Sequence, residues 1–171
     1  YLNISKFNTE SAVTMFQMFS NCQLLSSLDL SNFDTKSVTS FNRMFDQCQS
    51  LTSLNLSHFN TSSMKSMEYM FYNCSSLKYL DVSNFNTKLI TSMANVFRST
   101  KSLLFLNLTS FDIYDSTNIA YFLSETYSNI ILCYIESKMP AHFLIYFSFI
   151  YSRTSYQYSP GILYREFQFF L

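Results

Sequence analysis

A phenylalanine recurs along this chain at a fixed interval of 26 residues. The positions are Phe7, Phe33, Phe59, Phe85 and Phe111. Self-similarity at such a period is typical of stacked repeat architectures, because one unit of this length cannot bury its apolar face alone. The units must stack into an elongated array, and we expect function on a surface of that array rather than in a deep pocket.

Charge and glycine content narrow the possible partners. The chain has 11 Lys and Arg against 11 Asp and Glu, so a net charge of zero gives no electrostatic reason to bind nucleic acid. The single glycine, Gly161, excludes a glycine-rich phosphate-binding loop. Composition therefore gives no support for nucleic acid as the main partner or for a glycine-rich phosphate site.

Each repeat combines two periodicities, and the third unit shows both. Leu54 and Leu56 alternate with polar residues, as a short strand with one buried face requires. An apolar set at the spacing i, i+3, i+4 and i+7 follows, which is one face of a helix. That set is Met67, Met70, Phe71 and Cys74. Candidate helix N-caps stand just ahead of the corresponding sets: Thr14, Ser40, Ser66, Ser92 and Asn118.

This pattern predicts an α/β fold: a right-handed leucine-rich-repeat-like solenoid with one short parallel strand and one short helix per 26-residue repeat. We expect residues 1–128 to form an array of about five repeats. The first residues are already in repeat register, so we also expect neighbouring repeats of a longer array upstream. A threonine two residues after most of the phenylalanines is expected to serve turn backbone groups; these are Thr9, Thr35, Thr61 and Thr87.

The stretch LSSLDLSNFDTKSVTSFNRMFDQCQSL resembles the repeat of BspA-like leucine-rich-repeat surface proteins, and the resemblance extends from Tyr1 to about Ser128. Such proteins occur on bacterial surfaces and in some protists. The resemblance implies a cell-surface or secreted module for adhesion or recognition, without catalysis. It supplies no binding residues, since the family has no universal ligand. An intracellular protein-protein interaction scaffold of the same fold is the alternative.

The outward positions of the expected strands form the candidate ligand-binding face. One outward position of each repeat carries Asp or Asn, and another carries an aromatic residue in two repeats. The candidates are Asp29, Asn55, Tyr79, Asp81, Phe105 and Asn107. An aromatic side chain among short polar ones suits contact with a protein or a glycan. A solvated sheet face or a terminal packing patch would account for the same residues without a ligand, and the sequence leaves both alternatives open.

The residues that could carry chemistry are better explained by structural roles. Cys22, Cys48 and Cys74 share one repeat position, but stacked helices about 10 Å apart would hold them beyond disulfide reach, roughly 7 Å between Cα atoms. No Cys-x-x-Cys motif points to zinc, so we expect no metal and no cofactor. His58 occupies a slot held elsewhere by Asn and Ser, and no nucleophile and base are placed together. We therefore expect no enzyme.

The register fails after Ser128, and residues 129–171 form a divergent C-terminal tail rich in aromatic residues. One last strand is expected near residues 129–135. The apolar run from Ala141 to Tyr151 is eleven residues long, and a membrane span needs about 20. We expect the tail to cap the open end of the last repeat. Peripheral membrane contact, or a tail that is incompletely evolved or wrongly translated, would account for the same composition.

Overall fold

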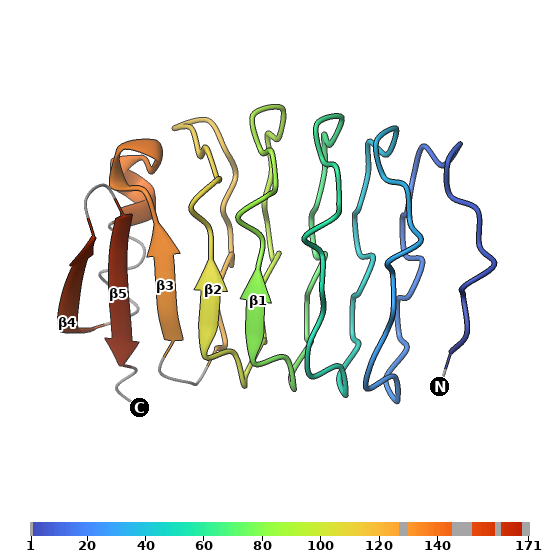
Figure 1. Cartoon of the computed structure of the whole chain (residues 1–171). Helices are drawn as coiled ribbons and strands as arrows, with labels where there is room; N and C mark the ends of the chain where they lie inside the picture. The colour runs from blue at the N-terminus through green and yellow to red at the C-terminus, as the bar shows by residue number, and fades with distance from the viewer. Residues whose placement is uncertain (1, 127–129, 145–151, 160–161, 169–171) are drawn as a thin grey trace.

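The computed structural model describes residues 2–126, 130–144, 152–159 and 162–168, the last two ranges as backbone. Successive 26-residue repeats lie side by side along an elongated coil, with the N-terminus at one end (Figure 1). We call each repeat a rung and number the rungs from the first, which contains Phe7, to the fifth, which contains Phe111. Hydrogen bonds and side-chain packing join each rung to the next, as the 26-residue period requires.

One five-stranded sheet runs along the coil at its C-terminal half, in the order β1-β2-β3-β5-β4. Its strands are β1 (Tyr79–Asp81), β2 (Phe105–Asn107), β3 (Ile130–Tyr134), β4 (Ser152–Ser159) and β5 (Ile162–Gln168). The first three pair in parallel, and β5 pairs antiparallel with β3 and β4 (Figure 1). In the described part of the chain, the earlier rungs reach this sheet only through an isolated bridge between Ser53 and Tyr79. The expectation of one strand per repeat is thus wrong for those rungs.

The expected helix of each repeat is also wrong. Residues 67–74 form successive turns, with Tyr69 at φ 57° and Asn73 at φ 53°. Left-handed residues every fourth position cannot belong to a right-handed α-helix. The turns close by three-residue steps, from Met70 N–H to the Met67 carbonyl at 3.1 Å. Each of the remaining rungs also has two positive-φ residues at the matching positions.

The remaining amides of these turns bond across rungs. The N–H of Phe71 donates to the Val96 carbonyl at 3.0 Å, and the N–H of Asn73 donates to the Arg98 carbonyl at 2.9 Å. A helix would have used those donors internally. We call residues 15–22, 41–48, 67–74, 93–100 and 119–126 the turn edge.

The candidate helix caps consequently have other roles: the hydroxyls of Ser66 and Ser92 donate across rungs to Asn42 and Glu68, and the remaining candidates close local turns. The Thr14 hydroxyl accepts the N–H of Phe16 at 3.1 Å, and the Asn118 side chain accepts the N–H of Ala120 at 3.0 Å. These two-residue loops are the local turns that Ser, Thr, Asn and Asp side chains favour. They direct the chain into the turn edge without starting a helix.

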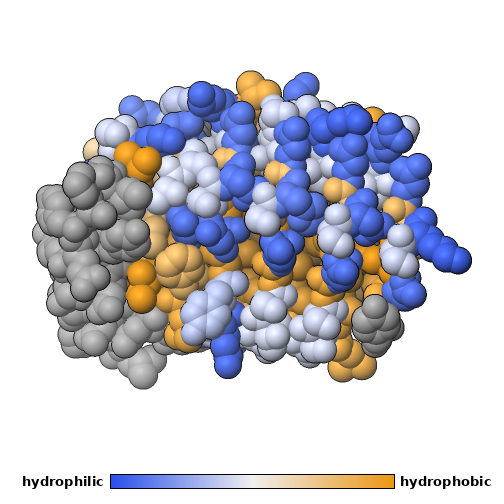
Figure 2. Space-filling model, in the orientation of Figure 1, coloured by the Kyte–Doolittle hydropathy of each residue, from blue (hydrophilic) through white to orange (hydrophobic). Residues whose placement is uncertain are grey.

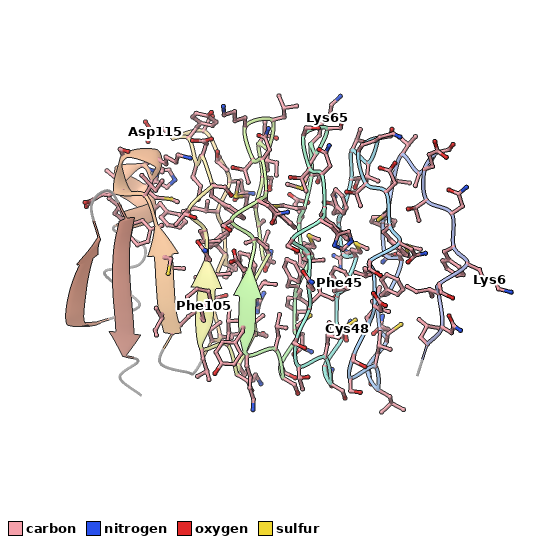
Figure 3. All side chains as sticks on the ribbon, in the orientation of Figure 1. Lys6, Phe45, Cys48, Lys65, Phe105 and Asp115 are labelled. Carbon is pink, nitrogen blue, oxygen red and sulfur yellow. The ribbon has the colours of Figure 1, made fainter. Side chains whose placement is uncertain are left out.

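The core is a column of stacked rings from the turn edge. Adjacent centroids along the column Phe19, Phe45, Phe71 and Phe97 are 5.8, 5.7 and 5.6 Å apart, with planes within 12° of parallel. The buried Phe45 and Cys48 lie in this interior (Figure 3). Leu54 and Leu56 are buried from the opposite side, so the predicted alternation is confirmed there. The apolar set at i, i+3, i+4 and i+7 also faces inward, although successive turns carry it and not a helix.

Buried threonines connect consecutive rungs. The hydroxyl of Thr35 donates to the Asn60 carbonyl at 3.0 Å and accepts the Asn60 N–H at 2.8 Å. Thr87 of the fourth rung makes the same two bonds with Asp112 of the fifth rung. The expected turn role is therefore found, but each hydroxyl serves the turn of the following repeat.

Residues 138–143 lie against the fifth rung. The Lys138 carbonyl accepts the N–H of Ile113 at 3.1 Å, and its ammonium lies 3.7 Å from the Asp112 carboxylate. Phe143 is fully buried, with its ring 5.6 Å from that of Phe122. These contacts cover the last rung of the array. Among the described residues, no helix has the length and apolar character that a bilayer crossing demands.

Candidate functional site

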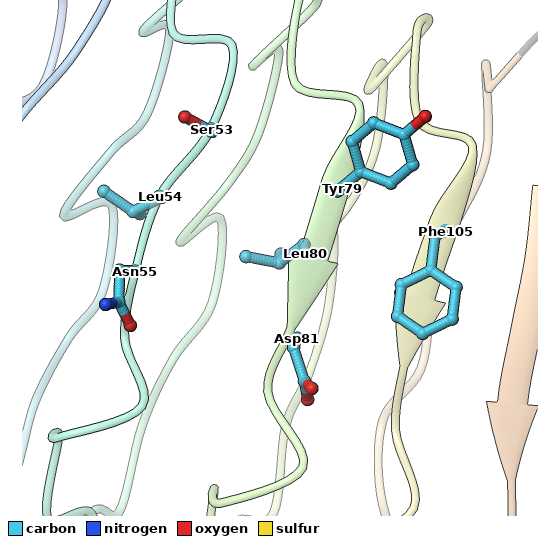
Figure 4. A pocket seen from close by; sticks show the side chains of 7 residues that line it. All are labelled: Ser53, Leu54, Asn55, Tyr79, Leu80, Asp81 and Phe105. Atoms are coloured by element: carbon cyan, nitrogen blue, oxygen red, sulfur yellow. The ribbon is translucent and has the colours of Figure 1, made fainter.

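A shallow open groove of about 500 Å³ lies on the outward side of β1, β2 and the extended segment 53–55 of the third rung (Figure 4). Its lining is Ser53, Leu54, Asn55, Tyr79, Leu80, Asp81 and Phe105. We call this outward surface the sheet face. In the space-filling view, polar residues form rows along this side of the molecule with hydrophobic surface between them (Figure 2). Both polar and apolar contacts are available to a ligand there.

The groove brings together four of the six predicted residues: Asn55, Tyr79, Asp81 and Phe105. Asn107 lies beside Asp81, its register partner in the sheet. Asp29 belongs to a rung farther toward the N-terminus and lines a separate hollow of about 60 Å³. The structure therefore separates Asp29 from the other candidates.

The Asp and Asn positions each hold a turn as well as facing outward. Asp81 accepts the N–H of Ser83 at 2.9 Å through one carboxylate oxygen, and Asn55 accepts the N–H of Ser57 at 3.1 Å. Asp29 does the same for Ser31, and these hydrogen bonds lower the pKa of its carboxyl. One oxygen of each side chain is thus committed to its own turn.

An apolar stripe borders these polar atoms. Tyr79, Phe105 and Ile131 are register partners on β1, β2 and β3, with Tyr79 59 % and Ile131 37 % exposed. Register partners on neighbouring strands are about 4.8 Å apart, so the three side chains form a continuous surface. Sequence reasoning missed Ile131, although it lies one repeat length after Phe105.

His58 has the structural role that its repeat position indicates. Its Nε2 lies 2.8 Å from the Leu30 carbonyl, and its ring stands edge-on to Phe59. Asn84 Nδ2 bonds the Leu56 carbonyl at 2.9 Å from the equivalent slot. The slot therefore ties each rung to the preceding one, and His58 is used as a connector.

The cysteines remain free thiols, but the reason expected from sequence is wrong. Without helices the rungs are joined by backbone hydrogen bonds, so they lie far closer than the helix spacing of about 10 Å. The thiols instead satisfy carbonyls: Cys48 donates to Phe19 at 3.2 Å, and Cys74 donates to Phe45 at 3.1 Å. Within the described ranges, no three His, Cys, Asp or Glu side chains gather closely enough to hold a metal ion.

Burial makes these thiols poor nucleophiles. It raises the pKa of Cys48 to about 12 and that of Cys74 well above the ordinary value. A thiol keeps its proton in the folded state until that raised pKa, whereas the unfolded chain loses it near pH 9. Both thiols therefore contribute their full stabilisation below pH 9. The contribution of Cys48 is lost as pH rises from 9 toward 12, and that of Cys74 is lost in the same direction.

We expect native alkylation at pH 8 to spare Cys48 and Cys74 and to modify the half-buried Cys22 first. Thiolate is the reactive form, and the two buried thiols carry almost none at that pH. Mass spectrometry of iodoacetamide-treated protein, before and after unfolding in urea, measures this. Rapid labelling of Cys74 in the folded protein would contradict the buried placement.

The turn edge carries a second cluster that sequence reasoning missed. The Arg43 guanidinium lies 4.1 Å above the ring of Tyr69, and that of Arg98 lies 5.1 Å above the ring of Tyr121. Tyr72 joins them, with its ring 5.7 Å from that of Tyr69. Arg43, Tyr69 and Tyr121 share one repeat position, which was the available signal. We call this cluster the Arg–Tyr strip.

Stacked rungs of one sequence pattern define a tandem-repeat protein. A family model described as "Mycoplasma protein of unknown function, DUF285" matches residues 2–103 and again 51–129. The chain therefore belongs to this family. Two overlapping matches are the result that a repeating unit produces. Neither among curated proteins nor among solved structures was a match found.

Proposed function

We propose that this chain is a non-catalytic recognition or adhesion module of a cell-surface protein and that its sheet face binds a protein or a glycan. The scaffold we propose is a leucine-rich-repeat-like solenoid related to the BspA-like surface proteins. Membership of a tandem-repeat family supports the scaffold. A stacked array offers an extended rigid surface, which is the usual binding element of repeat proteins.

The outward aromatic pair carries the proposal, with Tyr79 exposed and Phe105 half-buried. Tyr79 and Phe105 occupy the outward position at which earlier rungs have Ser27 and Ser53. Tyr79 remains 59 % exposed on a strand that hydrogen bonds hold in place. A rigid aromatic side chain loses little conformational entropy on binding and contributes large contact area. The neighbouring Asp81 and Asn55 supply a free acceptor and a free donor to fix orientation.

The same geometry favours binding over catalysis. A catalytic carboxyl needs a placed partner and a site from which water is largely excluded. Asp81 instead has one oxygen committed to the Ser83 N–H, in an open groove. Its surroundings suit a hydrogen bond to a ligand.

The combined substitution Tyr79→Ala and Phe105→Ala is expected to weaken ligand binding at least tenfold, since an anchoring aromatic side chain contributes about 2 kcal/mol or more. A panel of immobilised glycans and extracellular matrix proteins identifies the ligand, and titration then measures the dissociation constant. Tyr114→Ala is the matched control, because Tyr114 is 49 % exposed and does not line the groove. Unchanged affinity of the double variant would refute the assignment.

An intracellular scaffold is the second candidate, and the Arg–Tyr strip favours it. Tyr and Arg are enriched at protein interfaces, and Arg98 and Tyr121 lie on the turn edge, away from the groove lining. A scaffold with two surfaces would bind two proteins at once. Capture of a second protein that survives Tyr79→Ala but is lost with Tyr121→Ala would support this function.

A further inference from the structure

Two parallel rows of side chains cross the strands of the sheet face. Tyr79 and Phe105 are register partners in the first row. Asp81 and Asn107 are register partners in the second row, and Asn55 precedes them by one repeat. Register partners on neighbouring strands are about 4.8 Å apart, so both rows advance by the same step. A ligand that lies along the rows therefore meets a ring and a polar side chain together on β1 and again on β2.

The two rings present their flat faces to this surface. Figure 4 looks onto the faces of the rings of Tyr79 and Phe105. Phe105 is half-buried, so its ring lies against the sheet instead of projecting from it. The face of an aromatic ring is electron-rich and attracts C–H groups, which are weakly positive. The aromatic anchors of a protein interface instead fill pockets of the partner, and a ring that lies flat cannot do this.

The polar row alternates amide, carboxylate and amide. The Asn107 side-chain oxygen accepts the N–H and the hydroxyl of Thr109 at 3.2 and 2.9 Å, and Asn55 makes the same two bonds within its own turn. The Ser83 N–H holds the carboxylate of Asp81 between them. These bonds fix the orientation of the row before a ligand binds. A hydroxyl group both donates and accepts, so it can bond the carboxylate and a neighbouring amide together.

The size and the charge of the groove restrict the ligand further. Its volume of about 500 Å³ is in the range of small-ligand sites, about 300–1,000 Å³. A standard protein interface involves about 20–30 residues on each side. Among the residues that line the groove, Asp81 is the single charged one. A carboxylate without a lining cation repels a sulfated or acidic chain, so a slender and neutral ligand fits best.

We propose that the ligand of the sheet face is a neutral linear glycan that lies along the two rows. The C–H faces of successive sugar rings stack on Tyr79 and Phe105, and hydroxyls at the ring edge bond Asp81 and the amides of Asn55 and Asn107. A sugar ring carries an apolar face and a hydroxyl edge side by side, as the two rows require. This inference rests on the sheet face being the binding surface proposed above, and it selects one of the two ligand classes named there.

Calorimetric titration of the full chain with neutral linear hexasaccharides tests the ligand class. The probes are cellohexaose, laminarihexaose, mannohexaose and chitohexaose, compared with glucose, N-acetylglucosamine and a heparin hexasaccharide. At least one neutral hexasaccharide is expected to bind, and binding should be lost with the monosaccharides and with heparin at the same concentration. Binding of heparin alone, or no binding of any neutral hexasaccharide, would overturn the inference.

That failure is distinguishable from failure of the proposed function. If a protein ligand is found and the combined Tyr79→Ala and Phe105→Ala substitution weakens its binding, the sheet face is a binding surface and the glycan inference alone is wrong. If this substitution weakens the binding of no ligand, glycan or protein, the proposed function is wrong as well.

Variants that preserve the turns test the two rows separately. Tyr79→Phe keeps the ring face and should leave hexasaccharide affinity within about twofold, whereas Tyr79→Ala should lower it at least about tenfold. Asp81→Asn should lower it about fivefold. Asp34→Asn is the matched control, because Asp34 also accepts a turn N–H and lies outside the groove lining. Neighbouring rungs have Asn at both positions. Equal losses for the two Asp variants, or for the two Tyr79 variants, would overturn the inference.

Discussion

Replacing Phe71 with alanine is expected to lower the free energy of unfolding by about 3–5 kcal/mol, the range typical of a buried phenylalanine. Phe71 is fully buried, and its ring stacks on Phe45 at 5.7 Å and on Phe97 at 5.6 Å. The substitution removes contacts from both sides of the rung at once. Because each rung is stabilised mainly by its neighbours, the loss should also weaken the junctions on either side. Urea unfolding followed by circular dichroism measures the change.

Phe16→Ala is the control for this substitution. It deletes the same atoms from a turn-edge residue that is 53 % exposed, and exposed sites usually change stability by about 0.5 kcal/mol or less. Comparable losses for Phe16→Ala and Phe71→Ala would mean that the ring column is not the core of the array.

Thr35→Val is expected to cost about 1–3 kcal/mol, although the side chain keeps nearly the same shape. The Thr35 hydroxyl is the partner of both the N–H and the carbonyl of Asn60, at 2.8 and 3.0 Å. Valine would leave these groups unsatisfied beside a buried side chain, and an unsatisfied buried polar group carries its full desolvation cost. Thermal or urea unfolding provides the measurement, with Thr87→Val as an independent repeat of the experiment.

The exposed Thr91 supplies the matched control, because Thr91→Val makes the same chemical change on the surface. If Thr35→Val and Thr91→Val have equal effects, the threonines do not connect the rungs and the periodic hydroxyl has no stabilising role.

Much of the packing could be predicted from the sequence because the repeat supplies several examples of each position. The inward placement of Leu54, Leu56 and the Phe71 position followed directly from spacing. The expected helix did not follow from the spacing, because turns with a left-handed residue every fourth position bury the same i, i+3, i+4, i+7 set. Asn73 tolerates the left-handed region, but Tyr69 has no such preference. Inter-rung bonding, which sequence does not display, outweighs local propensity there.

The candidate site was predicted only in part, because the sequence shows which residues face outward but not how far apart the rungs lie. Strand alternation alone placed Tyr79, Asp81 and Phe105 outward. The Arg–Tyr strip depends on the distance between rungs, and the expected helices set that distance too large. Contacts such as Arg43 on Tyr69, at 4.1 Å, could not be anticipated at helix spacing.

We propose that the sheet face holds the ligand, and a hydrogen-exchange footprint of the complex tests this most directly. With the ligand found by the binding panel, added protection is expected at residues 53–55, 79–81 and 105–107, and the turn edge should be unchanged. Protection confined to the turn edge around Arg43, Tyr69 and Tyr121, with the sheet face unaffected, would contradict the claim.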